Sequence, residues 1–236
     1  MAECQGGVVL SSEQARRVYD RIGARQDTQS FYESPALDRM VRAADFGNAR
    51  SVVELGCGTG SFARRLLERE LPPDATYAGF DVSPTMVGLT RDRLEAFGGR
   101  ASVNLTEGSV QLPVAEGSGD RFVSNYVLDL LPEPTVRDVM AEAARVLRPG
   151  GRLCLVSLTF GCTVVSKGVI AVWRAVHRLS PVLTGGCRPV ALDRVVDAEA
   201  WRVLEEATVV SWGVPSEVLV AERRPGPDGK PGGVRT

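Results

Sequence analysis

The chain has 236 residues, 44% of them hydrophobic, and a formal net charge of -1 at pH 7. This length and apolar content are enough for one α/β domain with a sizeable core. The near-neutral charge, with no block of basic residues, offers no electrostatic surface for nucleic acid, so we expect no nucleic-acid partner.

The cysteine and histidine content excludes further classes of site. Five cysteines are widely spaced and odd in number, and His177 is the only histidine, which disfavours a disulfide framework and a zinc cluster. The apolar runs are too short to cross a bilayer, and the first residues lack the basic segment of a signal peptide. We expect a cytoplasmic protein with no metal site and no integral membrane association.

Residues 1–48 predict a helical cap. A capping pattern at Ser11 predicts a helix that ends at Gly23, and a second helix is expected from near Ser34 to Gly47. From residue 49 to about residue 158, apolar runs alternate with helical stretches, and Pro149 with its following glycines predicts a turn into the next strand. This alternation is typical of a doubly wound, mostly parallel sheet with helices on both faces.

The remaining residues predict a lid and a closing hairpin. Residues 160–195 are expected to be a lid insertion with a helix over 164–179. Two β-rich runs joined near Gly213 predict an antiparallel hairpin that completes the domain over residues 49–224. Residues 225–236 have no apolar content to bury and are expected to be a disordered tail.

The most informative stretch is VVELGCGTGSFA, residues 52–63. Glycines at alternate positions follow an apolar run and precede a helical stretch, which lets a ligand approach the backbone beside unpaired N–H groups. A nucleotide-like ligand fits such a site. The G-x-G-x-G spacing differs from the G-x-G-x-x-G of dinucleotide dehydrogenases, so an oxidoreductase is disfavoured.

Two acidic residues narrow the class of ligand that we expect. Asp81 ends the next predicted strand, at roughly the ~20 to 25 residue separation at which a carboxylate meets ribose hydroxyls. Glu54, at the end of the first strand, can orient the loop amides or attract a cationic group. A ligand with a positive charge and no phosphate suits these residues better than NAD.

Four segments together carry a family resemblance: VVELGCGTGSFA, AGFDVSPTMV, DRFVSNYVLDLLPE and EAARVLRPGGRLCLVSL. Over about residues 50–158 the chain resembles class I S-adenosylmethionine-dependent methyltransferases, most closely the small-molecule enzymes of the quinone-biosynthesis type. The resemblance implies a Rossmann-like α/β fold with a seven-stranded sheet, a C-terminal antiparallel hairpin and an N-terminal helical cap. It also implies S-adenosyl-L-methionine as the cofactor.

The resemblance further implies which residues contact the cofactor. The glycines would pack against its methionine part and ribose, Asp81 would bind the ribose hydroxyls, and Met86 would lie beside the adenine. In the family an acidic residue often binds the adenine amino group, whereas here Ser109 or water would take its place. The full expected set is Glu54, Gly56, Cys57, Gly58, Gly60, Asp81, Val82, Met86, Ser109, Val110, Asn125 and Tyr126.

Catalysis of methyl transfer depends mainly on positioning, but an acceptor hydroxyl of high pKa needs a group that takes its proton. His177 and Asp129 are the catalytic candidates. The alternative for His177 is a partly exposed position on a helix surface, and the alternative for Asp129 is to cap the helix that begins near Glu133. Tyr19, Tyr32 and Trp173 are expected to contact the acceptor, with packing as the alternative for each.

The apolar lid sequence VIAVWRAV favours a small, fairly apolar acceptor and O-methylation. The stretch VSNYV, residues 123–127, departs from the N-P-P-Y motif of exocyclic-amine methyltransferases, which disfavours nucleobase methylation. Two alternatives stay open: a cofactor-binding regulatory protein without methyl transfer, and a lipid or quinone C- or N-methyltransferase. Lys167, Arg174 and Arg178 are too few for firm membrane anchoring. A homodimer also stays open.

Overall fold

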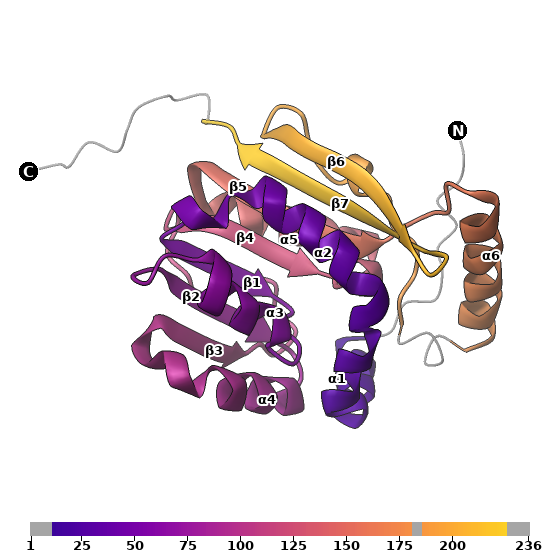
Figure 1. Cartoon of the computed structure of the whole chain (residues 1–236), viewed down its shortest axis with the longest axis horizontal. Helices are drawn as coiled ribbons and strands as arrows, with labels where there is room; N and C mark the ends of the chain where they lie inside the picture. Colours follow the sequence, from indigo (N-terminus) through magenta and orange to yellow (C-terminus); the bar gives the residue numbers. More distant parts are fainter. Residues whose placement is uncertain (1–10, 181–185, 226–236) are drawn as a thin grey trace, which may run out of the picture.

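The computed structural model describes residues 11–180 and 186–225 (Figure 1). Its strands are β1 (Ser51–Leu55), β2 (Thr76–Asp81), β3 (Ala101–Leu105), β4 (Gly119–Asn125), β5 (Leu147–Leu158), β6 (Trp201–Ser211) and β7 (Val214–Arg223). They form one seven-stranded sheet in the order β3-β2-β1-β4-β5-β7-β6. The first five strands pair in parallel, and β7 pairs antiparallel with both β5 and β6. The predicted fold class is therefore confirmed. The predicted tail lies, except for Pro225, outside the described residues.

Helices connect the strands. The α-helices are α1 (Ser12–Ile22), α2 (Ser30–Ala44), α3 (Ser61–Arg65), α4 (Pro84–Leu94), α5 (Glu133–Val146) and α6 (Val164–Leu179). The short helical segments are η1 (Gly23–Gln29), η2 (Phe46–Asn48), η3 (Leu66–Glu70), η4 (Glu95–Arg100), η5 (Leu128–Leu130) and η7 (Leu192–Arg194). The helix expected after the glycine stretch is thus α3 continued by the π-helical segment η3.

Helices cover both faces of the sheet, as the alternating pattern predicts. Val52 of β1 packs with Met40 of α2 in one hydrophobic cluster, whereas Val53 packs with Val139 of α5 in the other. Successive side chains of a strand point to opposite faces, so a strand with both faces covered is apolar throughout. Figure 1 shows α2 on one face of the sheet and α5 on the other.

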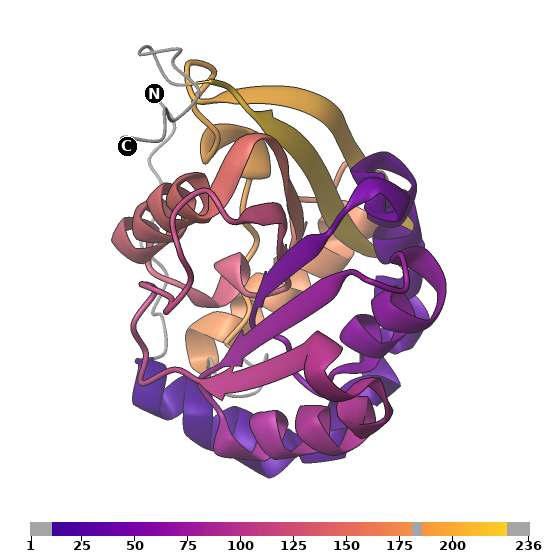
Figure 2. The same cartoon turned by 90° about the vertical axis from the view of Figure 1, so that its left-hand side faces the viewer.

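The two N-terminal helices pack in different places. A capping box begins α1, since Ser11 Oγ accepts a hydrogen bond from Gln14 N (3.2 Å) and Gln14 Oε1 accepts one from Ser11 N (2.9 Å). α1 then lies beside α4, and α2 contacts β5, β6 and β7 (Figures 1 and 2). α2 begins at Ser30, so the expected start near Ser34 is wrong, and Pro35 lies inside the helix.

The turn predicted at residues 148–151 is also wrong in detail. These residues belong to β5 as a bulge, because Gly119 of β4 pairs with Leu147 while Arg121 pairs with Arg152. Gly150 has a φ of +79°, a conformation that a bulged strand commonly assigns to glycine.

The sheet order places the site. β1 lies between β2 and β4, so the strand order reverses at β1. In doubly wound sheets the ligand binds at the carboxyl ends of the strands beside such a reversal. Leu55, Asp81 and Asn125 end these three strands and therefore meet at one edge.

Candidate functional site

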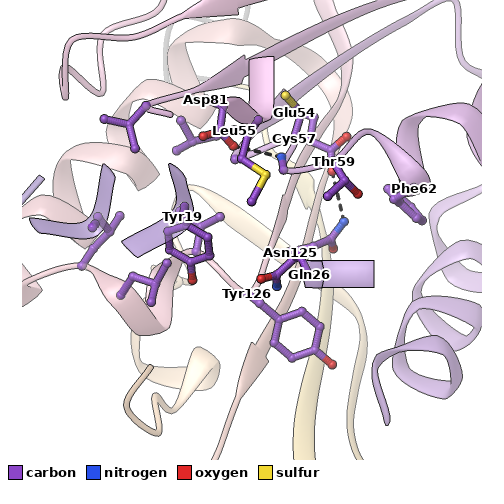
Figure 3. A pocket seen from close by; sticks show the side chains of 18 of the residues that line it. Tyr19, Gln26, Glu54, Leu55, Cys57, Thr59, Phe62, Asp81, Asn125 and Tyr126 are labelled. Carbon is purple, nitrogen blue, oxygen red and sulfur yellow. Dashed lines mark hydrogen bonds between the residues drawn. The ribbon is translucent and has the colours of Figure 1, made fainter. Parts of the chain in front are cut away.

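A cavity of about 590 Å³ opens at the carboxyl ends of β1, β2 and β4 (Figure 3). Its inner wall comes from the loop after β1, from the ends of β2 and β4 and from residues 106–110. Its outer wall comes from α1, η1 and α2. The N-terminal helices therefore enclose a site that the sheet alone would leave open.

The three glycines of the loop after β1 all have a positive φ, of +78°, +53° and +76°. A Cβ on Gly56 would lie 2.2 Å from Val127 Cγ2, and a Cβ on Gly60 would lie 2.7 Å from Thr90 Cγ2. Gly58 differs, since a Cβ there would meet no atom within 4 Å. Packing within the protein thus requires Gly56 and Gly60, and Gly58 alone leaves space toward the cavity. Gly60 is not among the lining residues.

Asp81 joins this loop to β2. Its Oδ2 accepts a hydrogen bond from Gly58 N (2.9 Å) and its Oδ1 accepts one from Ser83 N (2.9 Å). Burial raises the pKa of Asp81, although these hydrogen bonds oppose the rise. The carboxylate lines the cavity and fixes the loop at the same time. Val82 and Met86 line the cavity beside it, as do Cys57, Ser109 and Val110.

Buried Glu54 forms a polar pair with half-buried Asn125 under the loop. Glu54 Oε2 accepts a hydrogen bond from the Tyr77 hydroxyl (2.6 Å), and its Oε1 accepts one from Asn125 Nδ2 (3.3 Å). Burial raises the pKa of Glu54 to about 7. Asn125 Oδ1 has no hydrogen-bond partner within the described residues and lines the cavity. An unpaired buried acceptor at a cavity wall is suited to a ligand donor.

A group of tyrosines lines another side of the cavity. Figure 3 shows Tyr19 and Tyr126 on a different side from Asp81 and Glu54. Tyr126 has a φ of +54°, which is uncommon for a residue with a side chain and frequent at functional sites. Its hydroxyl lies 2.8 Å from Ser216 Oγ, and its ring packs edge to face against Tyr32 at 6.1 Å between centroids. Tyr32 supports this wall without lining the cavity.

Glu33 of α2 is a site residue that the sequence analysis does not select. It lines the cavity, and its carboxyl accepts a hydrogen bond from Tyr32. Burial raises the pKa of Glu33 to about 7, and the nearby Asp129 adds to the rise. In the sequence Glu33 cannot be distinguished from an exposed helical carboxylate. The only local signal is its position next to a cap tyrosine.

Asp129 lies behind this wall. It is fully buried in η5, does not line the cavity and accepts a hydrogen bond from Leu158 N (3.4 Å) through Oδ2. Burial raises the pKa of Asp129 to about 7. It does not cap α5, because Pro132 occupies the N-cap position.

His177 and Trp173 both belong to α6 and lie outside the cavity lining. His177 is buried, not partly exposed as one alternative expects. Trp173 Nε1 donates a hydrogen bond to the carbonyl of Cys187 (2.9 Å). Cys187 in turn hydrogen-bonds the Tyr19 hydroxyl and Asp129, so α6 connects to the tyrosine side through this cysteine.

The charged residues of the lining are mainly acidic. They are Asp27, Glu33, Glu54, Arg65 and Asp81. Arg65 pairs with Asp38 and Glu70, which offset its charge. Burial opposes ionisation of Asp27, but hydrogen bonds from Arg93 and Thr59 lower its pKa overall. The cavity therefore favours a cationic or neutral ligand over an anion.

Residues 11–180 and 186–225 contain no group of three or more histidine, cysteine, aspartate or glutamate residues that could hold a metal ion. In the same ranges, no helix combines the length and apolarity needed to span a membrane.

Comparisons with known proteins agree with this geometry. Residues 52–151 match a family described as a methyltransferase domain. The chain is 31% identical over 160 residues to a malonyl-[acyl-carrier protein] O-methyltransferase of Hahella chejuensis, covering 67% of this chain and 54% of that protein. It is 29% identical over 150 residues to the ubiquinone/menaquinone biosynthesis C-methyltransferase UbiE of Paracoccus denitrificans, covering 60% and 58%. The chain spans about half the length of the curated relatives it matches.

Solved structures share the fold. The [4+2]-cyclase SpnF superposes with a TM-score of 0.68 at 14% identity, covering 94% of this chain and 100% of that one. An O-methyltransferase family protein from Burkholderia thailandensis gives a TM-score of 0.67 at 22% identity, covering 91% and 61%. The sheet order, the glycine loop and these matches together support a methyltransferase domain of the class I, S-adenosylmethionine-dependent type.

Proposed function

We propose that the protein transfers a methyl group from S-adenosylmethionine to a small, fairly apolar and uncharged acceptor, with O-methylation favoured. The observation that carries this proposal is a single cavity whose lining includes Gly58 and Asp81 on one side and Tyr19, Glu33 and Tyr126 on another. Within the same proposal, residues 1–48 serve as the cap of the domain over residues 49–224. Residues 160–195 serve as its lid, and their described residues reach the cavity wall only indirectly, through Cys187 and Tyr19.

The lining suits the cofactor. When bound, S-adenosylmethionine supplies a methyl group already activated on a sulfonium. The space over Gly58 admits a ligand against the backbone, and Asp81 offers a carboxylate to the ribose hydroxyls. The unpaired Asn125 Oδ1 and the acidic Glu54 offer acceptors to a cationic group. Met86 and Val110 supply apolar contacts for the adenine.

The acceptor class follows from the charges. Acidic residues outnumber the single, doubly paired Arg65 in the lining, so a carboxylate or phosphate acceptor would meet repulsion. We assign Glu33 the role of taking the proton from an acceptor hydroxyl, because it lines the cavity and its pKa of about 7 lies near neutral pH. Asp129, buried behind the wall, would act on Glu33 only through its charge.

The relatives leave the methylated atom open, since their names include both O- and C-methyltransferases. A cyclase with the same fold shows that the fold alone does not set the reaction. The regulatory alternative therefore needs a direct test.

The test has two stages. Calorimetric titration with S-adenosylmethionine, S-adenosylhomocysteine and NAD should show binding of the first two and none of NAD. Incubation with S-adenosylmethionine and panels of phenols, quinols, carboxylic acids and thiols should then release S-adenosylhomocysteine with the uncharged hydroxyl compounds. Cofactor binding without turnover on any panel would favour the regulatory alternative, and binding of NAD alone would refute the proposal.

A further inference from the structure

α6 carries an apolar side that is exposed. The buried residues Ser166, Ile170 and His177 recur at the spacing of one helical face. Val164, Val172 and Leu179 share another face, and they are 89%, 67% and 87% exposed. A helix on a globular protein normally turns its apolar stripe toward the core. Here Ile170 packs inward, whereas Val164, Val172 and Leu179 stay exposed.

The tip of the β6–β7 hairpin extends this apolar surface. Trp212 at the turn is 81% exposed, and a Cβ on the next residue, Gly213, would lie 3.1 Å from Val169 Cγ2 of α6. Figure 1 shows α6 at the margin of the molecule, beside the tip of this hairpin. The α6 patch is defined here as Val164, Val165, Val172, Leu179 and Trp212. Exposed apolar groups gathered in this way mark interaction surfaces.

A basic stripe borders the patch. Lys167, Arg174 and Arg178 are exposed and share a third side of α6, at the spacing of a helical face. α6 contains no acidic residue. The helix thus combines a buried side, an exposed apolar side and a cationic side.

We propose that the α6 patch docks reversibly on an anionic lipid surface. A helix lying in the plane of a membrane buries its apolar side among the acyl chains and keeps lysine and arginine at the headgroups. Tryptophan is enriched at that depth. The cationic stripe complements anionic headgroups. A second copy of this chain fits less well, because it would bring three more cations to the same small contact.

Docking does not depend on methyl transfer, so it goes beyond the proposed function. The docking helix is nevertheless connected to the cavity. Trp173 of α6 is hydrogen-bonded to Cys187, which contacts Tyr19 of the cavity wall. The lipid-facing helix therefore lies next to the tyrosine side of the site.

Co-sedimentation of the full chain with lipid vesicles tests the proposal. We expect the protein to sediment with vesicles of phosphatidylcholine and phosphatidylglycerol and to stay in solution with phosphatidylcholine alone. Added salt should release it, because the attraction of a few exposed cations is screened. Equal sedimentation with both vesicle types would contradict the role of the basic stripe.

Matched variants separate the patch from general effects. Val165→Ser with Val172→Ser should weaken partitioning by roughly tenfold or more, since each valine loses buried apolar area. Val203→Ser with Leu204→Ser, exposed residues of β6, should leave it unchanged. Lys167→Glu with Arg174→Glu should weaken partitioning by about tenfold or more. Its matched control is Arg42→Glu with Arg69→Glu, which makes the same change in net charge on other elements.

Thermal unfolding and S-adenosylmethionine titration of each variant would show that it folds. Absence of sedimentation with every vesicle, or sedimentation that the α6 variants do not reduce, would overturn the proposal. A dimer in sedimentation velocity that Val165→Ser with Val172→Ser dissociates would overturn it in favour of a second copy of the chain.

Discussion

The amide of Gly58 donates a 2.9 Å hydrogen bond to Oδ2 of Asp81, which lies 23 residues away along the chain. This bond connects the two motifs that the sequence selects. It gives Asp81 two functions, because the carboxylate both holds the loop after β1 and faces the cavity. Substitutions at these two positions separate the functions.

Asp81→Ala should weaken S-adenosylmethionine binding by more than tenfold. The change removes the charge-assisted hydrogen bonds that we propose between Asp81 and the ribose, each worth roughly 1.5 to 3 kcal/mol. It also frees the amides of Gly58 and Ser83, so the melting temperature should fall. Asp81→Asn keeps one acceptor oxygen. Its affinity in calorimetry and its melting temperature should both lie between those of Asp81→Ala and the wild type. An unchanged dissociation constant for Asp81→Ala would remove Asp81 from the site.

Gly58→Ala should impair cofactor binding, with a loss of stability limited to the cost of backbone strain. Its Cβ enters open cavity space, and the left-handed backbone costs about 1–2 kcal/mol for alanine. A valine there would add the strain of a branched side chain at a φ of +53°, so alanine is the better probe. Titration calorimetry and urea unfolding of the same variant give the two readouts.

Gly56→Ala is the matched control, because its Cβ would collide with Val127 Cγ2. We expect lost stability in this variant, partly recovered by adding Val127→Ala, which removes the colliding methyl. Equal loss of stability in Gly58→Ala and Gly56→Ala would contradict the distinction drawn between these glycines.

The sheet and the side of the cavity formed by the loop after β1 were predictable because their signals are local. Alternating apolar runs set the strands, and Glu54, Gly58 and Asp81 lie in short motifs at strand ends. The tyrosine side was only partly predictable, since α1 and α2 line it and Cys187, after α6, hydrogen-bonds Tyr19 there, all through long-range packing. Nothing local to Glu33 reveals that α2 turns it toward Tyr126. Nothing in the pattern of α6 shows which of its sides is buried.

Glu33→Gln should lower kcat for a hydroxyl acceptor by about 100-fold or more, the scale of general base catalysis. In the wild type, kcat/KM should fall as the pH drops below about 7, because protonated Glu33 no longer accepts a proton. That acidic limb should disappear in Glu33→Gln, while S-adenosylmethionine binding stays intact. Glu54, with a similar pKa, serves as a control: Glu54→Gln should mainly weaken cofactor binding. An acidic limb that persists in Glu33→Gln would assign the proton transfer elsewhere.

Asp129 should make the folded state less stable as the pH rises toward 7. Burial raises its pKa from 3.8 to about 7, so between these values the native state binds a proton that the unfolded chain has released. Stability falls with rising pH wherever the native state binds more protons, and the total loss is on the order of a few kcal/mol. Urea unfolding at a series of pH values should show this decline in the wild type and a smaller one in Asp129→Asn, which carries no titrating group. Parallel curves for the two proteins would mean that Asp129 is already ionised in the native state, which its complete burial argues against.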